Sequence, residues 1–108
     1  MEWIEGGVTA PQGYAAAGVA CGLKKDGRPD LALLLSEKPA ASAGVFTANQ
    51  IKGHSLLLTQ TRVGRPVRAV LVNSGNANAC LGPRGDADAR AATSFVAETF
   101  GLAEEEVL

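Results

Sequence analysis

The sequence has little of several residue types that often mark a function. Aromatic residues make up 5% of its 108 positions, and it contains one histidine and two cysteines. Structural zinc sites use four closely spaced Cys and His ligands, so this supply predicts no metal site. Disulfides are rare in reducing compartments, and we expect Cys21 and Cys80 to be free thiols.

An excess of charge of one sign is also missing. Ten Lys and Arg residues stand against eleven Asp and Glu residues, and no segment combines basic with aromatic residues. Nucleic acid is therefore not an expected partner. The longest apolar run is far shorter than the roughly 20 residues that cross a bilayer. The acidic start of the chain does not resemble an export signal. We expect no membrane partner and a cytoplasmic location.

Hydrophobic residues are plentiful, at 46%, and they are mostly Ala, Val and Leu. A chain of this length buries only about 60–65% of its unfolded surface and supports one modest core. With few large side chains to anchor that core, the chain is expected to pack against something else. We therefore interpret residues 1–108 as a single partial domain of a larger protein.

Two apolar segments near the N-terminus predict a hairpin. Residues 18–24 and 31–36 flank the turn segment 25–30, and an Asp-Gly pair between apolar runs favours antiparallel neighbours. Residues 31–35 are almost continuously apolar, which is typical of a central strand covered on both faces. Residues 43–47 are predicted to form a third strand and residues 55–59 a fourth.

The second half predicts one further strand and one helix. Residues 67–73 are predicted to form a strand. Apolar and polar residues alternate at its start, and its end is expected to be fully buried. From Asp86 to Phe100 the apolar positions recur at helical spacing, and Gly101 suits a left-handed cap. Residues 102–108 favour a short helical turn. Strands followed by a helix, joined by hairpins rather than βαβ units, predict an α+β fold with a mixed, largely antiparallel sheet.

A polar segment follows the strand at 67–73 directly. It supplies amides, a hydroxyl and a glycine at a strand end, which is where sheets commonly place binding groups. Alternatively, Asn and Gly there simply form a turn. We predict that the segment supports a functional site through these residues: Asn73, Ser74, Gly75, Asn76 and Asn78.

Other candidates are weaker. A serine or cysteine nucleophile needs an oriented base, and nothing in the spacing joins Ser74 or Cys80 to His54, which reads as an ordinary hydrogen-bonded histidine. The glycine-rich opening, residues 6–13, lacks the Lys-Ser/Thr ending of a phosphate-binding loop. The acidic residues are interpreted as helix-capping groups, namely Asp86, Asp88, Glu104, Glu105 and Glu106.

Several separated segments together resemble one family. They are Gly6 to Tyr14, Ala17 to Lys25, Asp30 to Leu33, Ala43 to Asn49 and, most specifically, Val72 to Cys80 with its Asn-Ser-Gly-Asn-Ala-Asn-Ala string. In this order they resemble the N-terminal part of the ornithine acetyltransferases, also called glutamate N-acetyltransferases. The resemblance runs from about residue 6 to Leu108.

The resemblance implies a precursor that cleaves itself into α and β chains within an αββα sandwich. The new N-terminal Thr of the β chain carries acetyl from N2-acetylornithine to glutamate, and some members also accept acetyl-CoA; no cofactor is implied. The partners would be the rest of the α chain and the β chain, in a heterotetramer of two α and two β chains.

The resemblance also places the chemistry elsewhere. The Thr-Gly oxyanion-hole pair, the cleavage site and the nucleophilic Thr would all follow Leu108, so no catalytic residue is predicted in residues 1–108 and no activity is expected of them alone. Residues 52–55 depart from the family, whose members tend to have Ala and Pro there. Two alternatives remain: a self-processing aminopeptidase-like hydrolase of similar fold, and a non-catalytic module that binds a small polar ligand.

Overall fold

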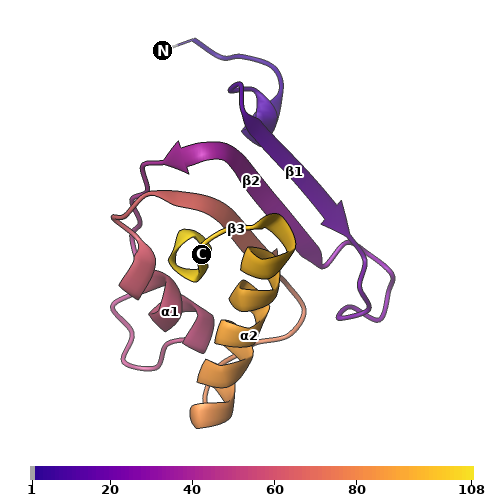
Figure 1. The fold of residues 1–108 in the computed structure, drawn as a ribbon. Helices are drawn as coiled ribbons and strands as arrows, with labels where there is room; N and C mark the ends of the chain where they lie inside the picture. Colours follow the sequence, from indigo (N-terminus) through magenta and orange to yellow (C-terminus); the bar gives the residue numbers. More distant parts are fainter. Residues whose placement is uncertain (1) are drawn as a thin grey trace.

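The chain forms a mixed sheet with two helices on one of its faces (Figure 1). The computed structural model describes residues 2–108. Within this range the strands are β1 (Tyr14–Val19), β2 (Leu31–Ala40) and β3 (Val67–Asn73), and they pair antiparallel in the order β1-β2-β3. The α+β class and the central position of residues 31–35 are therefore confirmed.

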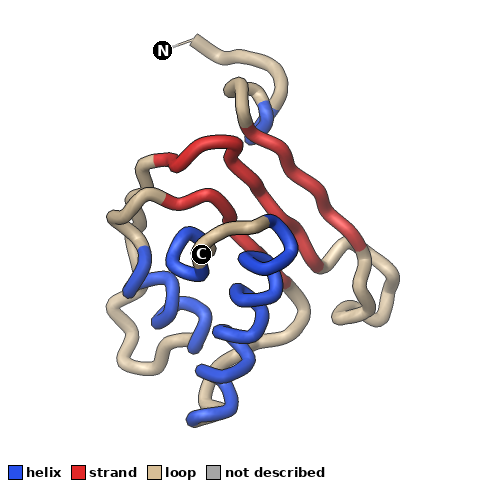
Figure 2. Tube along the Cα trace, in the orientation of Figure 1, coloured by secondary structure: helices blue, strands red, loops and turns tan. Residues whose placement is uncertain are grey.

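The helices are α1 (His54–Arg62) and α2 (Pro83–Phe100), with short 3-10 turns η1 (Gly7–Thr9) and η2 (Glu104–Glu106) (Figure 2). The predicted α2 is confirmed and starts three residues earlier than Asp86, because Pro83 suits the first turn of a helix. Gly101 ends it with φ of 64°, in the left-handed conformation expected of a C-terminal cap.

The prediction of a strand at residues 55–59 is wrong, because these residues lie in α1. A short run such as Leu56-Leu57-Leu58 fits a buried strand or a helix equally well. Tertiary contacts decide the outcome: the helix carries Arg62 inward, where its side chain is 6% exposed and contacts the C-terminal segment.

The predicted strand at residues 43–47 is also absent. Both edges of β2 are occupied, by β1 and β3. The segment is tied to the end of α1 instead, where the Ser42 hydroxyl donates to the Arg65 carbonyl oxygen and accepts from the Gly64 N–H.

The predicted hairpin is confirmed as a pair, but its first strand lies earlier than residues 18–24, at Tyr14–Val19. Asp30 gives the reason. Its carboxylate accepts hydrogen bonds from the backbone N–H groups of Cys21 and Lys24, at 2.7 and 2.8 Å. These bonds curl residues 20–24 into a loop and remove them from the strand.

The C-terminal residues add a parallel pairing to the sheet. Val107 bridges Ala69 in parallel, Leu108 N–H donates to the Ala69 carbonyl oxygen, and Leu71 N–H donates to the Leu108 carbonyl oxygen. Because β3 and residues 107–108 run the same way and are joined through α2, this part is a βαβ unit. The expectation of hairpin connections alone was wrong here.

The core lies between the sheet and α2. Its buried cluster comprises Ala69, Val96, Ala97 and Val107, and Leu33, Leu35, Leu71 and Leu102 pack around it. Successive side chains of a strand face opposite sides, so Leu34 and Val70, which are paired across β2 and β3, face away from the helices.

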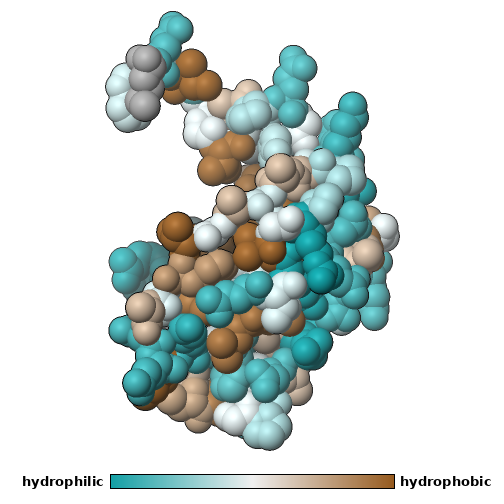
Figure 3. All heavy atoms as spheres, turned by 90° about the vertical axis from the view of Figure 1, so that its left-hand side faces the viewer, coloured by the Kyte–Doolittle hydropathy of each residue, from teal (hydrophilic) through white to brown (hydrophobic). Residues whose placement is uncertain are grey.

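Burial along individual elements differs from the sequence prediction. β3 is buried at its start, at Val67 and Ala69, and exposed at its end, the reverse of the predicted order. On α2, Ala89 and Val96 face the core as expected, but Phe95 is 70% exposed. Residues 31–36 of β2 are at most half-buried, so the expected cover on both faces is missing within residues 2–108. Figure 3 shows hydrophobic atoms at the surface on the side that carries α1.

Candidate functional site

The polar segment from Asn73 to Cys80, called the amide loop below, connects β3 to α2. Its first half is a tight turn: the Asn73 side-chain amide donates to the Asn76 carbonyl oxygen at 3.2 Å. Gly75 has φ of 95°, and a Cβ added there would lie 2.8 Å from the Lys24 side chain. This turn therefore fits closely against the loop that joins β1 to β2.

Asp30 holds this first half of the amide loop through its backbone. The Ser74 N–H donates to the Asp30 carbonyl oxygen at 2.8 Å, while the Asp30 carboxylate holds the β1–β2 loop. Asp30 is 3% exposed. The hydrogen bond from the Cys21 N–H, followed in size by that from the Lys24 N–H, stabilises the charged carboxylate and lowers the pKa of Asp30 to about 2. A hydrogen bond to this carboxylate in turn raises the pKa of the Cys21 thiol.

The second half of the amide loop is held by the starts of both helices. The Asn78 carbonyl oxygen accepts from the His54 N–H at 2.8 Å, and the Asn78 side-chain amide donates to the Gly85 carbonyl oxygen at 2.9 Å. Ala79 forms an antiparallel bridge with Gly53. The Asn78 Oδ1 atom is buried and has no hydrogen-bond partner among residues 2–108. Asn78 also lines the main pocket beside the loop.

His54 and Asp86, which the sequence did not connect, form a close pair. His54 Nδ1 lies 2.7 Å from Asp86 Oδ1, and the Leu81 N–H donates to His54 Nε2 at 3.3 Å. The His54 side chain is 11% exposed. The two residues are far apart in the sequence and on different helices, so no spacing signal could have joined them.

A pocket of about 220 Å³ opens beside the amide loop, between α1, β3 and α2. Its apolar walls include Leu58, Leu71 and Leu108. Its polar lining can donate and accept hydrogen bonds and consists of Ser55, Thr59, Asn73, Asn76, Asn78, Asp88 and Thr93. Three of the five predicted site residues thus meet at one pocket: Asn73, Asn76 and Asn78.

Ser74, Gly75 and Cys80 do not line this pocket. Ser74 lines a smaller hollow of about 130 Å³ with Asp30 and Gly18, and the structure brings no base to its hydroxyl within residues 2–108. Cys80 is exposed and adopts φ of 59°. Asp88, which does line the pocket, has its carboxylate 3.6 Å from the Arg84 guanidinium one helical turn earlier.

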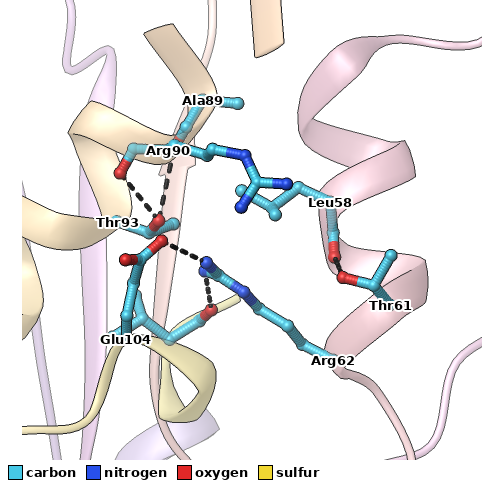
Figure 4. A network of polar contacts seen from close by, with 8 residues as sticks. Leu58, Thr61, Arg62, Ala89, Arg90, Thr93 and Glu104 are labelled. Carbon is cyan, nitrogen blue, oxygen red and sulfur yellow. Dashed lines mark hydrogen bonds and ion pairs between the residues drawn. The ribbon is translucent and has the colours of Figure 1, made fainter. Parts of the chain in front are cut away.

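The wall formed by Leu108 is fixed by a buried arginine (Figure 4). The Arg62 guanidinium donates to the Val107 carbonyl oxygen at 2.8 Å and to Glu104 Oε1 at 2.6 Å. Glu106 Oε2 accepts from the Ala103 N–H, which closes the η2 turn. The helical turn predicted near the C-terminus is confirmed, and one of its acids belongs to an ion pair.

The fold and the site define an α+β scaffold with an amide-lined pocket at the end of a mixed sheet. Residues 15–108 match the model of the ArgJ family, and the chain belongs to that family.

Two curated relatives, both named arginine biosynthesis bifunctional protein ArgJ, illustrate the similarity. The chain is 45% identical to that of Symbiobacterium thermophilum over 108 residues, which cover 97% of this chain and 27% of the relative. It is 55% identical to that of Mycobacterium tuberculosis over 94 residues, which cover 84% of this chain and 23% of the relative. The chain thus spans about a quarter of the length of these relatives.

Two crystal structures have the same fold. The arginine biosynthesis bifunctional protein ArgJ of Bacillus halodurans matches with a TM-score of 0.89 and 41% identity, over 94% of this chain and 54% of that one. The ornithine acetyltransferase of Mycobacterium tuberculosis, crystallised with ornithine, matches with a TM-score of 0.82 and 48% identity, over 93% of this chain and 55% of that one.

Neither helix of residues 2–108 is long and apolar enough to cross a membrane.

Proposed function

We propose that residues 1–108 are the N-terminal part of the α chain of a self-processing acetyltransferase of arginine biosynthesis. In this proposal the whole enzyme moves acetyl from N2-acetylornithine to glutamate. Support comes from membership of the ArgJ family and from the similar structure named an ornithine acetyltransferase. The domain is partial, and residues 1–108 alone have no transferase activity.

The nucleophile of the proposed reaction is the N-terminal Thr of a β chain, outside these residues. Its hydroxyl attacks the acetyl carbonyl, ornithine leaves, and the amine of glutamate then takes the acetyl group from the Thr. An N-terminal Thr suits this two-step route because its own α-amine can act as the base. Acetyl-CoA is a possible second donor, no cofactor is needed, and two α and two β chains assemble in the cytoplasm.

Division of the precursor into two chains has indirect support. The matched residues make up about a quarter of the curated relative from Mycobacterium tuberculosis but 55% of the crystallised chain from that organism. The crystallised chain is therefore about half as long as the curated protein. A precursor cut near its middle would produce this difference.

The parallel pairing of Val107 and Leu108 with β3 carries the proposed role of this chain. Parallel strands advance together by about 3.3 Å per residue, so the strand that continues from Leu108 in a longer protein runs towards Asn73. About the third residue after Leu108 then lies beside the amide loop. The Thr-Gly oxyanion-hole segment implied by the family resemblance belongs there, and the amide loop would hold it in place.

The open face of the sheet fits the same proposal. Val72 is 54% exposed on the face opposite the helices, and its register partner Ala32 is exposed as well. The second sheet of an αββα sandwich would cover this face. The remainder of the precursor supplies that layer.

The test is an assay of the full-length protein with N2-acetylornithine and glutamate. Mass spectrometry should detect N-acetylglutamate and ornithine, and should show two chains in place of one precursor. Absence of transfer in a correctly folded, cleaved protein would overturn the proposed function.

Variants of the amide loop test its supporting role. Asn76→Ala and Asn78→Ala should each lower kcat by about 100-fold, because a displacement of about 1 Å in a positioned group can cost that much. Asn49→Ala removes an exposed amide outside the loop and should leave kcat unchanged. Normal transfer by both loop variants would contradict this role.

A further inference from the structure

We propose that His54 is a positioning residue for the amide loop, fixed in one tautomer by Asp86. It holds Asn78 through its backbone and Leu81 through its imidazole. The inference rests on the proposed function only in so far as the amide loop supports catalysis. The tautomer of His54 is a separate property that can be measured on its own.

The segment from Asn78 to Leu81 wraps around the start of α1. The His54 N–H donates to the Asn78 carbonyl oxygen at 2.8 Å, and the Leu81 N–H donates to His54 Nε2 at 3.3 Å. Between these two bonds, Cys80 has φ of 59°, a conformation that is unfavourable for residues with a Cβ. Strained residues of this kind persist only where their surroundings hold them. One residue, His54, supplies a contact on either side.

The two contacts of the imidazole define its protonation. A nitrogen that accepts the Leu81 N–H carries no proton, so Nε2 is bare. Nδ1 then carries the proton of the neutral ring and donates it to Asp86 Oδ1 at 2.7 Å. The neutral Nδ1–H tautomer is the form that satisfies both neighbours. Asp86 thereby prevents the ring from turning its bare nitrogen away from the loop.

Gly85 completes the arrangement. A Cβ added to Gly85 would lie 2.1 Å from His54 Cδ2, so the ring lies directly on the backbone of α2. The Gly85 carbonyl oxygen accepts from the Asn78 side-chain amide at 2.9 Å. The same helical turn therefore contacts the His54 ring and orients the Asn78 side chain. The Oδ1 atom of Asn78 is buried and has no hydrogen-bond partner among residues 2–108, and Asn78 lines the pocket.

Three substitutions of His54 in the full-length enzyme separate its contacts. Gln can place an acceptor near the position of Nε2, Asn can place a donor near the position of Nδ1, and Phe keeps the ring but removes both. If the contact with Leu81 positions the loop, His54→Phe and His54→Asn should lower kcat at least 10-fold with little change in KM. His54→Gln should recover most of that loss.

The companion pair is Asp86→Ala and Glu98→Ala, both on α2. Asp86→Ala should lower kcat because the ring is free to turn, whereas Glu98→Ala, at an exposed position away from the loop, should not. Equal kcat for wild type and His54→Phe would overturn the inference. So would a His54→Gln variant as slow as His54→Phe.

The spectroscopic readout is ¹⁵N NMR of the full-length protein labelled at histidine, with the His54 signals assigned by their loss in His54→Phe. A protonated Nδ1 and a bare Nε2 are expected at neutral pH, and a protonated Nε2 would overturn the inference. A wild-type protein without transfer activity would overturn the proposed function, while this tautomer measurement would still decide the assignment of His54.

Discussion

Residues 2–66 and 67–108 stabilise the fold in different ways. The buried apolar residues of the described chain all lie in the second part: Val67, Ala69, Ala89, Val96, Ala97 and Val107. In the first part the buried residues are Asp30 and Arg62, both charged. The second part thus forms a core by burying apolar surface. The first part is attached to it by the pairing of β2 with β3, by the Arg62 side chain, and by the backbone carbonyl oxygen of Asp30, which accepts from the Ser74 N–H.

The largest effect should come from breaking the polar attachment at Arg62. Arg62→Met keeps the apolar stem but leaves the Val107 carbonyl oxygen and the Glu104 carboxylate without their partner. We expect a loss of about 2–3 kcal/mol in the free energy of unfolding, because removing one member of a buried pair strands the other. Urea unfolding followed by circular dichroism measures it.

Arg28→Met is the matched control within the same part of the chain. Arg28 pairs with Asp26 at 2.6 Å, but its side chain is 74% exposed. Exposed pairs of this kind contribute less than about 1 kcal/mol. If the two variants lose the same free energy of unfolding, burial is not the reason that Arg62 stabilises the fold.

A smaller effect is expected from the apolar core. Val107→Ala removes two methyl groups from a side chain that is 0% exposed, and we expect a loss of about 2 kcal/mol. Val19→Ala makes the same chemical change on β1, where the side chain is 52% exposed, and should cost less than about 0.5 kcal/mol. Thermal unfolding of the two variants measures this difference between the buried and the exposed valine. Similar shifts of the two unfolding midpoints would contradict it.

The effect of Asp30, unlike the others, should depend on pH. Its pKa in the folded protein is about 2, against 3.8 ordinarily. The folded state therefore binds fewer protons, and the stabilisation is complete above about pH 4–5 and lost as pH falls towards 2. Asp30→Asn should flatten the pH dependence of the unfolding midpoint between pH 2 and 5. An unchanged slope in the variant would contradict the contacts assigned to this carboxylate.

Elements with a strong local signal could be predicted from the sequence. The periodicity of α2 and its Gly101 cap, the strand at 67–73 and the central position of residues 31–35 all appear in the structure. The segments 43–47 and 55–59 were predicted wrongly. Neither has a local pattern that decides its state, and both are fixed by contacts with distant residues, through Ser42 in one case and Arg62 in the other.

The candidate site was predictable only in part. Three amides in one short segment were visible in the sequence, and they do line a pocket. The pairing of His54 with Asp86 was not visible, because it joins the starts of two helices. The close contact between the His54 ring and Gly85 could not be predicted either, because a glycine in a helix does not indicate which side chain packs on it.

The position of Val107 in the core also bears on how the chain folds during its synthesis. Among residues 2–66, no apolar side chain is buried within the described part of the chain. Val107 and the carbonyl group that Arg62 binds emerge more than forty residues after Arg62 itself. We therefore expect β1, β2 and α1 to remain open to solvent until α2 and the residues after it have been made. Slowing translation before residue 107 should consequently prolong the exposure of the nascent chain to proteases and chaperones.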